Sequence, residues 1–295
     1  MGNGHLKNDI IVYRNKERRP LHNGWPPLSS LSFTDRGICA LGRRTIDSLN
    51  HILDLFAFAC KISSLLLMRN REGRSIVYHI TIQQIYFTAV QALPIIFFIS
   101  LIIGSMIVIQ FSKQFGTVEG NYILGNLVVF LIVRELGPLI TAIIVILRTA
   151  VAVTIEIGYM NVLHEMEAIE MMGIDPLYTV CLPRLIGITT AILCLFVIFD
   201  VVALIGGYLI SWTFTDIPME YFLPQIGKAI TGTDLAVGII KGLFFGYIIT
   251  TVCLYQGFRI KNSITEIPPG TSRAAVECLL YCLFVNITIS VIFYL

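Results

Sequence analysis

Residues 134–184 read RELGPLITAIIVILRTAVAVTIEIGYMNVLHEMEAIEMMGIDPLYTVCLPR, and this stretch decides the fold. It begins with a charged pair and a Gly-Pro break inside an apolar run of membrane length. It continues as an acidic helix and ends at Gly-Ile-Asp-Pro, just before another apolar run. A chain that crosses a bilayer and sends one ordered helix out between two crossings usually binds a partner there. We therefore expect this helix to couple the membrane domain to another protein.

The composition places most of the chain in a membrane. Hydrophobic residues make up 56% and charged residues 14% of the 295 residues, and the mean hydropathy is +0.79. A soluble protein carries about 25% charged residues, whereas apolar runs long enough to cross about 30 Å of hydrocarbon recur along this chain. We predict an all-α integral membrane protein with five transmembrane helices, at about 88–111, 122–148, 185–212, 235–257 and 274–295.

Two segments precede the first predicted span. Residues 1–40, which are basic and contain several Gly and Pro, are predicted to be a flexible cytoplasmic leader. Residues 41–87 are predicted to form interfacial helices, because apolar side chains recur at helical spacing over 45–68 against a charged face, and a second short helix follows near 76–86. Such helices lie in the membrane interface rather than across it.

The distribution of basic residues predicts the orientation. Of the 21 Lys and Arg, 12 lie before residue 75, and the loops expected outside carry only Lys113 and Lys228. Basic residues concentrate on the cytoplasmic side of membrane proteins, which explains the basic N-terminal region without nucleic-acid binding. We predict a cytoplasmic N-terminus, a C-terminus on the outer side of the membrane and a cytoplasmic loop between the second and third spans.

Arg134, Glu135, Asp200 and Lys241 lie well inside predicted spans, where a charge is costly unless it faces protein or water. Arg134 and Glu135 are adjacent and point about 100° apart on a helix, so they are poorly placed to pair with each other. They line a cavity or dimer seam, or they form structural ion pairs with other helices beside the Gly-Pro kink. Asp200 and Lys241 are suited either to ion coupling or to structural pairing.

The acidic helix predicted over 155–172 has an apolar stripe formed by Tyr159, Val162, Met166 and Ile169, with acids on its other faces. We interpret it as a docking helix; the alternative is a solvated connector. Its HEMEAIE segment is not HExxH, and no second matching helix suggests a metal site. No GxxxxGK[ST] or GxSxG motif is present, so we expect a non-catalytic chain without cofactors. The seven cysteines show no CxxC pair and suggest no disulfide framework or zinc site.

Over about residues 45–295 the sequence resembles the MlaE-type permease family, the membrane subunits of ABC transporters that work with MCE-domain lipid-binding proteins. The matches in the first span and just before the last span are weaker than those within residues 134–184. The family usually has Gly shortly after the central arginine, whereas this chain has Ala150, which leaves the turn after the second span open. The matching pieces are Ala92-Leu93-Pro94-Ile95, Gly104, Gln110, Arg134-Glu135-Leu136-Gly137-Pro138, Arg148, Glu156-Ile157-Gly158-Tyr159-Met160, the run from Glu167 to Pro176, Pro183-Arg184 and Gly270-Thr271-Ser272-Arg273-Ala274-Ala275.

The resemblance implies a homodimeric permease in the inner membrane of a two-membrane bacterium, with residues 88–295 as the permease domain and the C-terminus in the periplasm. A separate P-loop ATPase subunit would bind ATP and Mg²⁺ and dock on the coupling helix. An MCE-domain protein would bind the outer side, a small STAS-type subunit would regulate the complex, and phospholipid would pass through a cavity at the dimer seam.

The resemblance also assigns site residues. Arg134, Glu135, Pro94 and Gly104 would belong to the lipid cavity or dimer seam. The coupling segment, 153–176, would act on the ATPase through Glu156, Met160, Glu165, Glu167, Glu170, Gly173, Asp175 and Pro176.

Two other functions compete with phospholipid transport. An ion-coupled secondary transporter would use Asp200 or Lys241, although the sequence shows no duplicated half of the kind found in inverted-repeat transporters. A structural scaffold would only anchor MCE proteins and would tolerate Glu135→Gln.

Overall fold

The computed structural model describes residues 33–67, 74–115, 120–213, 219–260 and 263–294. Every regular element in these ranges is a helix, as the composition predicts. Five helices are long and apolar enough to cross a membrane: Val77–Gln114, Gly125–Val162, Leu177–Ile210, Gly232–Arg259 and Ile264–Phe293. The chain is therefore an all-helical multi-pass membrane protein, and each observed span overlaps one predicted span.

The chain divides into two compact units, Met1–Asp54 and Leu55–Leu295. In the first unit the described part is the beginning of α2 (Phe33–Leu67). Ile46, Leu49 and Leu53 lie on one face of this helix and are each nearly 60% exposed, at 58%, 59% and 59%. An uncovered apolar face is typical of an interfacial helix. Of the predicted leader, 1–32 lie outside the described residues, and 33–40 belong to α2.

The second unit begins with the end of α2 and then the first span. The short helix predicted near 76–86 is α3 (Arg74–Thr88). It continues through a single 3-10 turn, η2 (Val90–Ala92), into α4 (Leu93–Phe115). The first candidate span accordingly starts at Val77 rather than at 88, because no helix-breaking residue separates α3 from α4.

The second span is longer than predicted, and the docking helix is divided. The second span comprises α5 (Gly120–Val129), η3 (Phe130–Leu136), α6 (Gly137–Val145), η4 (Ile146–Ala150) and α7 (Val151–Val162). The helix expected over 155–172 is therefore interrupted: its first half is the end of the span, and its second half is α8 (Glu165–Met171). The break falls at His164, whose φ of 58° is left-handed and ends the preceding helix.

The sequence left open a turn after the second span near Ala150, and the structure has no turn there. Ala150 is fully buried and lies in η4, a π-helical segment that carries the span onward into α7. Arg148 in the same segment donates to the Phe87 carbonyl at 3.0 Å and to Oε1 of Gln91 at 2.5 Å. It therefore joins the second span to the end of α3 and to η2. The chain therefore does not turn at Ala150, the position near which the family usually has Gly.

The remaining spans follow the predicted order. The third consists of η5 (Leu177–Cys181), α9 (Leu182–Val201), η6 (Val202–Gly206) and α10 (Gly207–Ser211). An amphipathic helix that the sequence analysis placed in a loop, α11 (Met219–Ala229), precedes the fourth span, α12 (Gly232–Arg259). The fifth consists of η7 (Ile264–Glu266) and α13 (Ile267–Tyr294).

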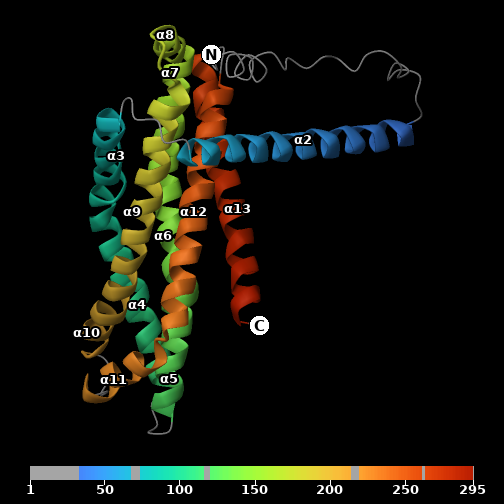
Figure 1. Ribbon diagram of the computed structural model, residues 1–295. Coiled ribbons are helices and arrows are strands. Elements are labelled where there is room, and N and C mark those ends of the chain that lie inside the picture. Colours follow the sequence, from blue (N-terminus) through green and yellow to red (C-terminus); the bar gives the residue numbers. More distant parts are fainter. Residues whose placement is uncertain (1–32, 68–73, 116–119, 214–218, 261–262, 295) are drawn as a thin grey trace. The chain divides into compact units, whose positions relative to one another are not determined.

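Within the second unit, α12 packs against α9, α13 and α7, while α3 packs on α9, and α4 on η6 and α10. Figure 1 shows α6, α9 and α12 running side by side. Ile132, Phe199, Phe245 and Ile249 are fully buried among these helices. Glycine permits a close crossing of α12 and α9: a Cβ at Gly246 would lie 2.6 Å from the Cα of a threonine in α9. Small residues allow such approaches between membrane helices.

Candidate functional site

Arg134 and Glu135 lie in η3 (Phe130–Leu136), a π-helical segment in the first third of the second span. The Gly137 N–H bonds to the Ile132 carbonyl, five residues back, which is the π-helical pattern. Pro138 follows and has no N–H to donate to the carbonyl four residues earlier, that of Arg134. The Gly-Pro pair thus ends the π-helix and leaves a backbone acceptor inside the span without its α-helical donor.

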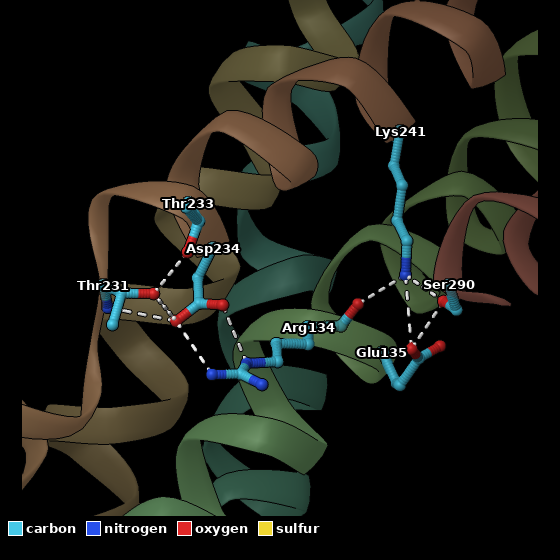
Figure 2. Close-up of polar contacts among 7 residues, drawn as sticks. All are labelled: Arg134, Glu135, Thr231, Thr233, Asp234, Lys241 and Ser290. Atoms are coloured by element: carbon cyan, nitrogen blue, oxygen red, sulfur yellow. Dashed lines mark hydrogen bonds and ion pairs between the residues drawn. The ribbon is translucent and has the colours of Figure 1, made fainter. Parts of the chain in front are cut away.

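Arg134 forms an ion pair with Asp234 at the start of α12. Its Nε lies 2.8 Å from Oδ1, and its Nη2 donates to Oδ2 at 3.1 Å. Asp234 is 1% exposed and also accepts the backbone N–H and the hydroxyl of Thr231, at 3.0 and 2.7 Å, in a capping box. Figure 2 shows the guanidinium meeting the carboxylate edge-on. The N-terminus of the fourth span is thereby fixed to η3 of the second span.

Glu135 points to different partners, in α12 and α13. Its Oε1 accepts the Ser290 hydroxyl at 2.6 Å, and its Oε2 accepts Nδ2 of Asn286 at 2.9 Å. Nζ of Lys241 lies 3.4 Å from Oε1. The expectation that Arg134 and Glu135 do not pair with each other is confirmed, since each joins the second span to another span.

Lys241 is fully buried, and its ammonium group has three acceptors. It donates to the Arg134 carbonyl at 2.6 Å, to Oγ of Ser290 at 2.8 Å and to Glu135 at 3.4 Å. An ammonium group has three N–H donors, so this buried cation is satisfied. The sequence suited Lys241 either to ion coupling or to structural pairing, and its observed contacts are those of structural pairing.

One polar network, which we call the three-span network, is formed by six residues: Arg134, Glu135, Asp234, Lys241, Asn286 and Ser290. Figure 2 shows all of them except Asn286. It holds spans two, four and five together by charge-assisted bonds, which are stronger than neutral ones. Its Arg134 end borders an open pocket of about 440 Å³ that Lys228 and Phe130 also line. The network stabilises charge within a membrane domain, and its Arg134 lines the pocket together with a second cation, Lys228.

Gly104 and Pro94 occupy other places. Gly104 is buried at the crossing of α4 with η6 and α10, where an added Cβ would overlap the Ala203 backbone. Pro94 is exposed near the start of α4. The structure brings Arg134 and Glu135 into one network and leaves Gly104 in a helix contact. A lipid cavity or seam that includes all four residues stays a prediction.

The predicted coupling residues are distributed over α7, α8 and the following turn. In α8, Met166 is buried, whereas Glu165 and Glu170 are exposed and Glu167 is half-buried beside His164, with 3.3 Å between Oε2 and Nδ1. The other predicted coupling residues differ in exposure. Glu156, Gly173 and Asp175 are exposed, whereas Met160 is half-buried and Pro176 is buried.

The turn after α8 has a defined backbone. Gly173 has a φ of 82°, and its N–H bonds to the Glu170 carbonyl at 2.9 Å, which closes the helix. Asp175 accepts the Leu177 N–H at 2.9 Å, so it starts the next segment. The Gly-Ile-Asp-Pro sequence therefore determines how the chain returns to the third span.

Sequence reasoning missed three members of the network: Asp234, Asn286 and Ser290. Two signals could have identified them. Thr231 precedes Asp234 by three residues, the spacing of a capping box at the start of an apolar run. Asn286 and Ser290 are four residues apart in the last span and so share a face. Among the residues that the structure describes, no group of three His, Cys, Asp or Glu is placed to hold a metal ion.

Comparison with known proteins agrees with this architecture. Residues 81–292 match the family described as Permease MlaE. The chain is 27% identical over 218 residues to the intermembrane phospholipid transport system permease protein MlaE of Haemophilus influenzae, covering 74% of this chain and 84% of that protein. It is 27% identical over 214 residues to a probable ABC transporter permease protein of Rickettsia prowazekii, covering 72% and 82%.

A plant protein is similar over much of the same region. Protein TRIGALACTOSYLDIACYLGLYCEROL 1, chloroplastic, of Arabidopsis thaliana is 25% identical over 233 residues, which are 79% of this chain and 66% of that protein. The family match covers well over half of the 295 residues and contains three of the five candidate spans, together with nearly all of the other two. The chain belongs to the MlaE permease family.

Proposed function

We propose that this chain is the permease subunit of an ABC transporter that moves phospholipid between a membrane and an MCE-protein tunnel, driven by a separate ATPase chain. The observation that carries the proposal is membership of the MlaE family, supported by the similarity to a phospholipid transport permease of Haemophilus influenzae. The chain would act as a homodimer in the inner membrane, with its N-terminus in the cytoplasm. An MCE-domain protein would bind outside, and a small STAS-type subunit inside.

The helix α8 is the surface that we assign to the ATPase. It follows the second span after a two-residue turn and carries three glutamates, of which Glu165 and Glu170 are exposed. Met171 and Met172 at its end are 83% and 68% exposed. Flexible apolar side chains beside acids suit a partner groove with a basic rim. ATP and Mg²⁺ would be bound by that partner.

The transport step would be a rigid-body movement. Closure of the ATPase dimer would displace α8 and tilt the spans connected by the three-span network. A change in tilt would close the space at the dimer seam and release phospholipid toward the MCE protein. The pocket beside Arg134 and Lys228 is suited to an anionic headgroup, since guanidinium and ammonium groups bind phosphate.

The ion-coupled transporter stays the alternative, and one observation favours it. Asp200 is buried, and its Oδ1 has no hydrogen-bond partner among the described residues. Buried carboxyl groups inside membrane spans serve as proton or ion sites in other transporters. Lys241, the other candidate, is engaged by three acceptors, so this alternative now depends on Asp200.

Purification from the native membrane tests the proposal. The chain would be extracted in mild detergent, and its companions would be identified by mass spectrometry. We expect a P-loop ATPase, an MCE-domain protein and bound phospholipid. Recovery of the chain without an ATPase in every mild detergent tried would refute the ABC assignment and favour gradient-driven transport.

A further inference from the structure

An ion pair joins the two ends of the segment that leaves the membrane domain. Nη2 of Arg184, at the start of α9, lies 2.7 Å from Oε1 of Glu156 in α7. The Arg184 side chain is 7% exposed, and its Nη1 donates to the Val180 carbonyl at 3.1 Å. The resemblance assigns Glu156 to contact with the ATPase, but in this structure its carboxylate is held by an arginine of its own chain. The pair closes the segment 157–183 at its base.

A second connection holds α7 to the end of α12. Nδ2 of Asn161 donates to the carbonyls of Phe258 and Ile260, at 3.2 and 2.5 Å. These carbonyls lie at the C-terminal end of α12, where the last helical carbonyls lack intrahelical donors. The side chain of Asn161 therefore binds α7 to the fourth span without competing with that helix's own hydrogen bonds.

The helices at this connection are in close contact. A Cβ at Gly257 in α12 would lie 2.7 Å from Cβ of Ile157, and a Cβ at Gly158 would lie 3.0 Å from Cδ1 of Ile260. There is no space in which α7 could shift on α12 without moving it. Dense packing of this kind transmits displacement instead of absorbing it.

The helix α8 is attached to α7 by only Leu163 and His164. Met166 of α8 is buried, and α8 packs on α7. A displacement of α8 therefore reaches α7 first. From α7 it passes to the third span through Arg184 and to the fourth span through Asn161. The fourth span carries Asp234 and Lys241, so the same displacement reaches the three-span network.

We propose that Glu156, Arg184 and Asn161 are positioning residues that make the ends of spans two, three and four move as one body when α8 is displaced. The inference rests on the proposed transport function and adds the route by which the work of the ATPase reaches the membrane domain. Glu156 acts within the chain and does not contact the ATPase. Without this junction, ATP hydrolysis would continue and less lipid would move for each ATP.

The test uses the whole complex, purified and reconstituted in phospholipid vesicles. ATP hydrolysis and transfer of a fluorescent phospholipid would be measured on the same samples. We expect Glu156→Gln and Arg184→Gln each to retain the ATPase and its turnover but to lower lipid moved per ATP about fivefold or more, the low end of typical coupling effects. Asn161→Leu should have the same effect through the other connection.

Two further variants separate positioning from general damage. The exchange Glu156→Arg with Arg184→Glu restores the pair with its charges reversed and should recover most of the lipid moved per ATP, which a merely misfolded site would not. Glu266→Gln is the matched control, because Glu266 is an exposed acid in η7, near the same end of α12, without a recorded side-chain partner among the described residues. It should behave as wild type.

The outcomes are distinct. If both single variants at the ion pair move wild-type amounts of lipid per ATP, the junction is not part of the route. If Glu156→Gln releases the ATPase from the complex while Arg184→Gln does not, Glu156 contacts the partner directly and the inference is wrong. If the wild-type complex transfers no phospholipid with ATP, the proposed function itself fails, before any variant is compared.

Discussion

The ammonium group of Lys241 donates a 2.6 Å hydrogen bond to the backbone carbonyl of Arg134. This carbonyl is the acceptor that Pro138 would serve in a regular α-helix if proline had an N–H. A break in the second span and a buried cation in the fourth thus satisfy each other. Unpaired backbone groups in hydrocarbon cost several kcal/mol, so the Gly-Pro sequence and Lys241 are best explained together.

The first prediction concerns the buried charges of the three-span network. Glu135→Leu should destabilise the protein by about 3–5 kcal/mol, because it leaves Lys241 buried without its carboxylate. Adding Lys241→Met should restore only part of this loss, because both charges are then gone but the Arg134 carbonyl loses its donor. Unfolding of the purified protein in detergent would measure both variants. Equal losses for the single and double variants would show that the pair is not coupled.

The second prediction concerns the crossing of the first and third spans. Gly104→Ala should cost about 1–3 kcal/mol, because its new methyl group would overlap the Ala203 backbone. Gly227→Ala is the matched control: nothing lies within 4 Å of a Cβ added there, and alanine favours a helix. Thermal unfolding in detergent would compare the two. A stable Gly104→Ala variant would contradict the close contact.

The third prediction concerns the end of α8. Gly173→Ala should cost about 1–2 kcal/mol at this turn, because a left-handed backbone with φ of 82° crowds a side chain. Contacts would not contribute, since the space around Gly173 is open. Faster hydrogen exchange of the amides at 173 and 174 would report the loss. Gly173→Asn should exchange more slowly than Gly173→Ala, because asparagine tolerates this conformation.

The fourth prediction concerns the ATPase contact. Glu167→Lys combined with Glu170→Lys should weaken retention of the ATPase by at least about tenfold, because like charges at an interface are strongly unfavourable. Phospholipid transfer should fall with it. Pull-down from detergent would measure retention, and a normal unfolding temperature would establish that the permease is folded. Glu266→Lys serves as control. Unchanged retention and transfer would remove the acids of α8 from the docking surface.

The fifth prediction separates ATP-driven from ion-driven transport. Asp200→Asn keeps the shape that packs against Gly137, so it should change stability by less than about 1 kcal/mol and retain transport. A protonophore should likewise leave transfer into vesicles unchanged. Loss of transport in Asp200→Asn with the fold intact, together with sensitivity to the protonophore, would establish the ion-coupled alternative.

Much of the fold could be predicted because the relevant signals are local. A span must satisfy its backbone hydrogen bonds internally, so each long apolar run can only be a helix. The predicted ends of the spans were less accurate. The second span continues to Val162, beyond the predicted end at 148, because helical spacing does not reveal where a helix leaves the lipid. The break at His164 depends on one left-handed backbone conformation, which no residue pattern in HEMEAIE predicts.

The sequence by itself determined the number of spans, their order and the charged residues that had to find partners. Only the tertiary structure decided the partners: Asp234 for Arg134, Asn286 and Ser290 for Glu135, and Arg184 for Glu156. The physical reason is rotation about the helix axis. A span that is apolar on every side has no face that periodicity can assign, so its polar groups are oriented by packing against other helices. For Arg134 and Glu135 these helices lie 100 or more residues away in the chain.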